Sequence, residues 1–297
     1  MKKTKIIYYI FPFHIDLLER TINQLKRASN YSNLKDYLSM EVVLNMSDKN
    51  IDWSKCDIPK QYFIDKFRHI ETYCDFFESV SFEIDNELLG SGAQHRRTYN
   101  NNDGKYNIIA LDPDIYFPVE IFYILENIIP SIEEKTSTYM ITPQITKWWD
   151  SSWDIISNKK YINSSLKFDE INTFELDSCN VEKINLIQNY NHKFAGGWFN
   201  FYSAELTKLI KLPESIGIFY HQDLFIQESF KILNTKGHDI PQYIIENCIV
   251  SEDRKYYHKN EYLHQKYLPY QKNRAHMGDS NEVYLKVVEE LNKLKNG

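Results

Sequence analysis

The sequence has little cysteine and no long apolar run. Its four cysteines lie far apart and include no C-x-x-C pair, which excludes a zinc knot and a dense disulfide framework. No stretch of about 18 uncharged apolar residues occurs, so we expect no membrane-spanning helix. The apolar start at residues 6–13 is broken by Pro12 and lacks a small-residue cleavage site, which predicts a β-strand rather than a signal peptide. These absences favour a cytoplasmic protein with free thiols and leave peripheral contact with the inner face of a membrane open.

Several widespread motifs are also missing. The chain contains no G-x-x-x-x-G-K-[ST], G-x-G-x-x-G or G-x-S-x-G pattern, and its nine histidines form no H-E-x-x-H pattern. P-loop nucleotide hydrolysis, dinucleotide-dependent dehydrogenation and serine hydrolysis are therefore disfavoured. The 35 Lys and Arg against 41 Asp and Glu give a net charge of −6, which argues against nucleic acid as a partner. Any site for a polyanion must be local.

What the sequence does contain is an ordinary globular composition with an excess of aromatic residues. Its 297 residues are 42% hydrophobic and 26% charged, which predicts a soluble folded chain. We find no internal repeat or low-complexity linker and therefore expect a single domain. Aromatic residues make up 15%, either through codon bias or because some rings line a sugar-binding cleft. The candidates for stacking are Trp198 and the cluster of Trp148, Trp149 and Trp153.

Strand-like and helix-like segments alternate along the first half of the chain. The expected strands cover residues 5–13, 41–44, more weakly 61–64, and most clearly 106–111. A helix is expected after Asp16, whose spacing to Glu19 resembles a capping box. This alternation predicts an α/β fold with a mixed, mostly parallel sheet flanked by helices, which binds ligands at the carboxyl ends of its strands.

The second half is less regular. Residues 147–191 indicate long loops or small hairpins, and 243–250 predicts a late strand. A C-terminal helix is expected over 279–295, because Asp279 and Glu282 have capping-box spacing and an apolar face follows.

Two carboxylates, Asp112 and Asp114, flank a proline directly after the strongest strand. Carboxylates with this spacing at a strand end can approach one divalent cation, and hard oxygen ligands suit Mg²⁺ or Mn²⁺. The other interpretation is a strand-terminating turn in which both side chains cap local backbone amides.

Three further groups are candidates for a site. Arg96 and Arg97 can neutralise a diphosphate, hold an acidic turn, or form a solvated pair. The 196–198 stretch, Gly-Gly-Trp, can pack an acceptor sugar on an aromatic face or form a bend before a core ring. Asp223 lies between apolar residues and fits a general base or a helix N-cap equally well.

Taken in order, these stretches resemble a GT-A-fold glycosyltransferase, similar to the large inverting glycosyltransferase family 2, which uses nucleotide-sugar donors. No single motif is specific, and the resemblance rests on their joint order over residues 5–260. The corresponding stretches are 8–13, the turn Asn45-Met46-Ser47-Asp48, Gly92-Ala93-Gln94-His95-Arg96-Arg97, Ile108-Ile109-Ala110-Leu111-Asp112-Pro113-Asp114, Gly196-Gly197-Trp198 and Gln222-Asp223.

The resemblance implies a Rossmann-like GT-A domain over 1–297, with a nucleotide-sugar half (1–117), an acceptor half (118–260) and a helical tail (261–297). The implied donor site comprises Phe11, Asn45, Asp48, Arg96, Arg97 and Asp112. Gly196, Gly197 and Trp198 would bind a saccharide or glycan acceptor, and Asp223 would deprotonate its hydroxyl. The implied metal is Mn²⁺ or Mg²⁺, held by Asp112, Asp114 and a late histidine.

Three departures from the family pattern are visible. Gln222 replaces the acidic residue that usually precedes the base, and the second strand ends at Asn45 rather than in an Asp pair. The late metal-binding histidine has no clean counterpart; His258 is the first choice, with Asp253 and His264 as alternatives.

Two other functions fit parts of this pattern. A haloacid-dehalogenase-like phosphatase also uses D-x-D after a strand, but that motif usually opens the chain, and it needs Thr or Val where this chain has Tyr116. The other alternative is a carbohydrate-binding protein that keeps the fold without turnover, which Gln222 and the missing third ligand favour.

Overall fold

A computed structural model describes residues 2–49, 51–87, 91–146, 154–162, 176–193, 196–215, 222–252 and 280–296. Its strands are β1 (Thr4–Ile10), β2 (Leu38–Asn45), β3 (Ser79–Asp85), β4 (Asn107–Leu111), β5 (Ile115–Tyr116), β6 (Met140–Ile145), β7 (Asn185–Asn189), β8 (Phe199–Tyr202) and β9 (Gln242–Glu252). Its α-helices are α1 (Ile15–Ser29), α2 (Lys60–Glu71), α3 (Ser91–Asn102), α4 (Ile121–Glu133), α5 (Lys159–Ile162), α6 (Ala204–Leu209), α7 (Gln222–Thr235) and α10 (Ser280–Asn296). Short 3-10 helices are η1 (Pro12–His14), η2 (Asn33–Tyr37), η3 (Trp53–Lys55) and η7 (Val181–Lys183).

These strands form one mixed sheet in the order β3-β2-β1-β4-β8-β6-β9-β5, with β7 also paired to β9. Strands β3, β2, β1 and β4 run parallel, so their carboxyl ends meet at one edge. Strand β8 runs antiparallel to β4, which places its first residue, Phe199, beside Leu111 at that same edge. Strands β6 and β9 are again parallel to each other. The predicted mixed α/β sheet with flanking helices is confirmed.

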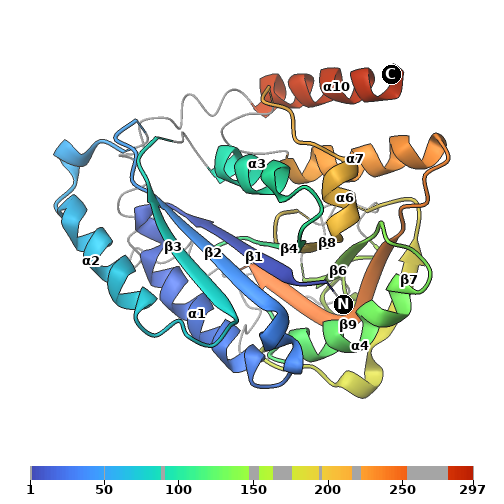
Figure 1. The fold of residues 1–297 in the computed structure, drawn as a ribbon, viewed down its shortest axis with the longest axis horizontal. Coiled ribbons are helices and arrows are strands. Elements are labelled where there is room, and N and C mark those ends of the chain that lie inside the picture. The colour runs from blue at the N-terminus through green and yellow to red at the C-terminus, as the bar shows by residue number, and fades with distance from the viewer. Residues whose placement is uncertain are drawn as a thin grey trace.

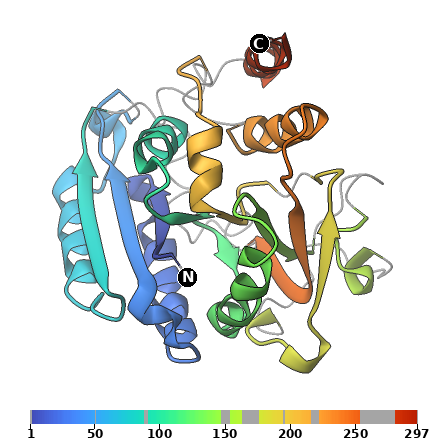
Figure 2. The same ribbon diagram turned by 45° about the vertical axis from the view of Figure 1, so that its right-hand side comes forward.

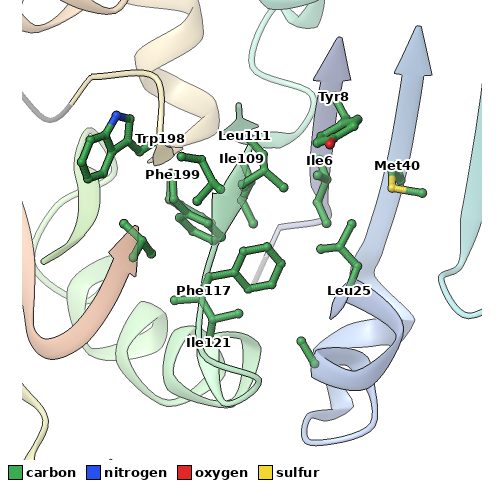
Figure 3. Close-up of a cluster of buried hydrophobic side chains, with 14 of the residues drawn as sticks. Ile6, Tyr8, Leu25, Met40, Ile109, Leu111, Phe117, Ile121, Trp198 and Phe199 are labelled. Atoms are coloured by element: carbon green, nitrogen blue, oxygen red, sulfur yellow. The ribbon is translucent and has the colours of Figure 1, made fainter. Parts of the chain in front are cut away.

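Helices cover both faces of the sheet (Figures 1 and 2). Helices α1, α2 and α4 lie on one face, and α3, α6 and α7 on the other, with α10 packed on the outside of α7. Each face buries its own hydrophobic cluster. Figure 3 shows part of the α1-side cluster, in which Ile109, Leu111 and Phe199 lie above Phe117 and Ile121. No helix in the described ranges is both long enough and apolar enough to span a membrane.

Several expected elements are confirmed and others are wrong. The strands expected at 41–44, 106–111 and 243–250 are present as β2, β4 and β9, and the expected C-terminal helix is α10. Residues 61–64 belong to α2 instead of a third strand, and the third strand is β3. The strand expected over 5–13 ends at Ile10, where η1 follows.

The capping box expected at Asp16 does not form. Helix α1 begins at Ile15, two residues earlier than expected, with His14 at the N-cap position and no capping side-chain hydrogen bond. The Asp16 carboxylate instead accepts a hydrogen bond from Lys66 Nζ at 2.6 Å and ties α1 to α2. The tryptophan cluster Trp148, Trp149 and Trp153 lies outside the described residues, as does Asp279. The division of the chain at residues 117 and 260 stays a prediction.

Candidate active site

The D-x-D pair, Asp112 and Asp114, lies at the carboxyl edge of the sheet, directly after β4. Asp114 is 7% exposed, whereas Asp112 is half-buried. The Tyr8 hydroxyl donates a hydrogen bond of 2.8 Å to the carbonyl oxygen of Pro113, which lies between the two carboxylates. Because Tyr8 is itself fully buried in β1, the turn that carries both carboxylates is anchored to the neighbouring strand.

Other carboxylates approach this pair from distant parts of the chain. Burial, reinforced by the nearby charges of Asp114, Asp223 and Glu252, raises the pKa of Asp112 well above its ordinary value. Glu252 is brought there by the antiparallel pairing of β5 with β9, in which it lies opposite Ile115. The site therefore concentrates negative charge contributed by the β4 turn, α7 and β9.

Asp223 occupies the first turn of α7 rather than the position before the helix. The helix begins at Gln222, and Asp223 Oδ1 accepts a hydrogen bond of 2.8 Å from the backbone N–H of Leu224. A carboxylate in the first turn is stabilised by the positive end of the helix dipole. This arrangement places the Asp223 carboxylate at the start of α7, close to Asp112 and Asp114.

The glycine pair approaches the same carboxylates from the beginning of β8. A Cβ atom at Gly197 would lie 2.6 Å from Asp112 Oδ2 and 2.7 Å from Oδ1, which no side chain could accommodate without moving Asp112. Gly196 has φ of +64°, a backbone conformation that favours glycine. The two glycines thus let the backbone pass directly over the Asp112 carboxylate.

Trp198 is only 5% exposed and belongs to the α1-side hydrophobic cluster, where Figure 3 shows it beside Phe199. The core interpretation of this ring is therefore the one that its packing supports. Its contribution to acceptor binding, like that of Gly196 and Gly197, stays a prediction.

The two arginines of α3 are held by protein partners. Arg97 Nη1 lies 3.2 Å from Glu83 Oε1 and 3.3 Å from Asp85 Oδ2, on β3. Arg96 Nη1 donates to the carbonyl oxygen of Glu214 at 3.2 Å. Arg97 thus holds an acidic strand end, one of the functions that its sequence position allowed, and phosphate binding by either residue stays a prediction.

The expected nucleobase turn lies at the same edge, after β2. Asn45 is fully buried, and its Oδ1 accepts a hydrogen bond of 3.0 Å from the backbone N–H of Ser47. Asp48 is exposed and forms an ion pair of 2.8 Å with Lys60 Nζ. Phe11 follows β1, and its backbone N–H donates to His14 Nδ1 at 3.3 Å. The topology therefore places these three of the six expected donor residues at or shortly after strand ends.

The donor set fits a hard divalent cation in part. Asp112 and Asp114 offer carboxylate oxygens next to two more carboxylates, and bringing so many together is costly unless a cation neutralises them. Within the ranges that the structure describes, no three His, Cys, Asp or Glu side chains already stand in a metal-binding arrangement. The expected third ligand His258, and the alternatives Asp253 and His264, lie outside those ranges.

Sequence reasoning missed two residues of this site, Glu252 and Tyr202. Tyr202 is fully buried at the end of β8, with its ring edge-on to Tyr99 at 5.9 Å between centroids. Burial raises the pKa of the Tyr202 hydroxyl well above its ordinary value, and the charges of Asp223 and Asp112 add to this effect. A four-residue strand without alternation gave no sequence signal that this hydroxyl would lie near the carboxylates.

Comparison with known proteins gives likenesses to solved structures alone, because no family model and no curated protein sequence matches the chain. The chain is similar to TarS from S. aureus, with 13% identity and a TM-score of 0.44, over 82% of this chain and 36% of that one. A structure of the TarS fragment 1–349 gives the same identity and TM-score over 85% and 58%. A mycobacterial protein matches with 10% identity and a TM-score of 0.42, over 84% and 67%. The chain thus spans between about a third and three fifths of the TarS chains.

Proposed function

We propose that this protein is a metal-dependent glycosyltransferase with the GT-A fold. It moves a sugar from a nucleoside-diphosphate sugar to a hydroxyl group of a saccharide or glycan acceptor, with inversion at the anomeric carbon. The observation that carries the proposal is the convergence of Asp112, Asp114 and Asp223 at the carboxyl edge of the sheet, where α/β proteins bind their ligands. The expected donor residues that follow the neighbouring strands of the sheet support the same function.

Asp112 and Asp114 are the residues that would hold Mn²⁺ or Mg²⁺, with Glu252 next to them. When bound, the cation supplies positive charge against the departing nucleoside diphosphate. The missing side chain at Gly197 leaves room for the Asp112 carboxylate, because a Cβ atom there would lie 2.6 Å from Asp112 Oδ2. Arg96 and Arg97, on α3, are the proposed phosphate-side cations of the donor site.

Asp223 is the proposed general base. It takes the proton from the acceptor hydroxyl as that oxygen attacks the anomeric carbon, and the nucleoside diphosphate leaves from the opposite side. A single displacement of this kind inverts the anomeric centre. The acceptor would enter beside the glycine pair, because Gly197 lies directly against the Asp112 carboxylate at the start of β8, and Trp198 would follow it in the acceptor site.

The proposal is tested by thermal-shift measurements with nucleoside diphosphates and nucleotide sugars, with and without Mn²⁺. We expect metal-dependent stabilisation by at least one nucleotide and turnover of the corresponding sugar donor. Asp114→Ala should weaken nucleotide binding through the metal. Asp223→Asn should abolish turnover and leave donor affinity nearly intact, because it removes the base and keeps the side-chain shape.

Asp36→Asn, an exposed change in η2, is the matched control and should behave like the natural protein. If no nucleotide stabilises the protein in a metal-dependent manner, the enzyme assignment is wrong. If Asp223→Asn loses donor binding as well as turnover, the base has been misassigned. Binding without any turnover would instead support a non-catalytic carbohydrate-binding protein.

A further inference from the structure

A groove runs along α1, between this helix and a wall that includes Tyr116 and Asp177. It encloses about 430 Å³, within the range of about 300–1,000 Å³ usual for small-molecule sites. One wall is the α1 stripe from Asp16 to Arg27, and the other includes Tyr116 and Asp177. The eleven steps from Asp16 to Arg27, at about 1.5 Å each, make the stripe roughly 16 Å long, which suits an extended ligand.

Three side chains of α1 fix the opposite wall. Arg20 donates to the carbonyl oxygen of Ile115 at 3.4 Å, and Gln24 Nε2 donates to the carbonyl oxygen of Phe117. Arg27 holds the Asp177 carboxylate through both oxygens, at 3.0 and 2.6 Å. These contacts, spaced along one helix stripe, keep the two walls at a set separation. The groove is therefore preformed rather than a gap between mobile segments.

The groove presents groups that a hydroxyl-bearing ligand would satisfy. Gln24 is buried, and its Oε1 accepts no hydrogen bond from any residue within the described ranges. Asn23 is exposed on the same stripe and offers both an amide donor and an acceptor. The half-buried ring of Tyr116 lies under the Arg20 guanidinium at 4.2 Å, which fixes the orientation of an aromatic surface in the wall.

The charges in the groove are matched by opposite charges of the protein. Arg27 pairs with Asp177, and Lys66 from α2 lies 2.6 Å from Asp16 and 3.6 Å from Glu19. With Arg20, three cations thus stand against three carboxylates. The three carboxylates would repel an anionic ligand, and the guanidinium groups would repel a cationic one. Charged and amide groups also make the groove unsuitable for an apolar ligand.

We infer that this α1 groove binds a neutral saccharide, the distal part of the glycan whose end reacts at the carboxylate site. Choosing the acceptor as the ligand rests on the proposed function, whereas the preference for an uncharged, hydroxyl-rich ligand rests on the groove itself. Tyr116 lies two residues after Asp114, so the groove and the carboxylate site share one short segment of the chain.

The test is to fill the groove without disturbing the core. Asn23→Trp places a large ring in the groove from an exposed position, and Lys26→Trp adds the same ring to an exposed position of α1 that does not line it. Binding of short neutral oligosaccharides of hexoses and N-acetylhexosamines is measured by saturation-transfer NMR and titration calorimetry. We expect Asn23→Trp to weaken binding about tenfold or more. Lys26→Trp should bind like the natural protein.

Each outcome bears on one proposal. Equal affinity of Asn23→Trp and the natural protein, no binding of any neutral oligosaccharide, or displacement of the saccharide by inorganic phosphate would overturn the groove assignment. Donor hydrolysis without acceptor should be unchanged in Asn23→Trp. If the natural protein turns over no nucleotide sugar but binds the saccharide, and Asn23→Trp loses that binding, the proposed function fails and the groove assignment stands.

Discussion

Among single residues, Gly197 and Asp112 depend on each other most directly. The glycine lies over the Asp112 carboxylate so closely that a single added methyl group would occupy the position of its oxygens. The carboxylate has little freedom to retreat, because its turn is anchored through the Pro113 carbonyl to Tyr8. The identity of residue 197 thus sets where one of the proposed metal ligands lies.

Gly197→Ala is therefore expected to damage function more than folding. The new Cβ would push the Asp112 carboxylate aside, and a misplacement of about 1 Å at a reacting centre can cost on the order of 100-fold in rate. Turnover and Mn²⁺-dependent nucleotide binding are measured beside thermal unfolding. Gly237→Ala is the control: its φ of +91° makes alanine strained, but no atom lies within 4 Å of the new Cβ. Full activity in Gly197→Ala would show that Asp112 need not keep its observed position.

Among the elements, α7 links the candidate site to the C-terminal helix. Its first turn carries Asp223, and its outer side receives α10, whose Val287 is fully buried. Val287 belongs to the hydrophobic cluster of the α3 side together with Phe225, Ile226 and Phe230 of α7. Helix α10 therefore supports the element that positions the proposed base.

Replacing Val287 by Asp should detach α10 from α7. Loss of a buried valine and burial of a charge should lower the free energy of unfolding by about 3 kcal/mol, measured by urea denaturation. Leu285→Asp is the matched control on the same helix, because Leu285 is 65% exposed and should change stability by less than about 0.5 kcal/mol. Similar losses in both variants would mean that α10 is not held through Val287.

The elements also show which features the sequence could predict. Strands β2 and β4 were predictable because each is a short run of buried apolar residues that ends in a polar turn. Helix α3 was hidden by its polarity, since glycine, glutamine, two arginines and three asparagines mask its one buried side. In α2, Phe63 and Ile64 looked like a strand because the apolar run is short, and its helical period is completed only by Phe67 and Ile70.

The same distinction holds for the site. Asp112, Asp114 and Asp223 could be proposed from local patterns, since each lies where a strand or helix begins or ends. Glu252 could not, because only the pairing of β9 with β5 brings it beside the D-x-D turn. Tyr202 could not either, because it pairs with Ile108 of β4, and only its buried side chain feels the charges of Asp112 and Asp223. Contacts between segments so far apart in the sequence leave no local signal.

For the molecule as a whole, the buried histidines His95 and His192 link stability to pH. Burial lowers the pKa of His95 from 6.5 to about 4, and it lowers the pKa of His192 to about 4 as well. His95 lies between the rings of Tyr9 and Tyr99, at 6.3 and 6.0 Å between centroids, and His192 lies 4.9 Å from the ring of Phe230. Both therefore stay neutral in the folded protein at pH values where an unfolded chain binds a proton.

Acidification from pH 7 to pH 4 should consequently destabilise the fold. Below about pH 6.5 the histidines of the unfolded chain bind protons, whereas the native histidines stay unprotonated until about pH 4. The free energy of unfolding therefore falls as the pH falls. The lowered pKa of His95 corresponds to roughly 3 kcal/mol over this window, fully present above pH 6.5 and lost toward pH 4. His95→Phe keeps a ring against Tyr9 and Tyr99 but cannot titrate, so urea denaturation across this range should show a shallower slope.

His69→Gln, at an exposed position of α2, should keep the natural slope. If His95→Phe loses stability on acidification as steeply as the natural protein does, then His95 takes up its proton in the folded state.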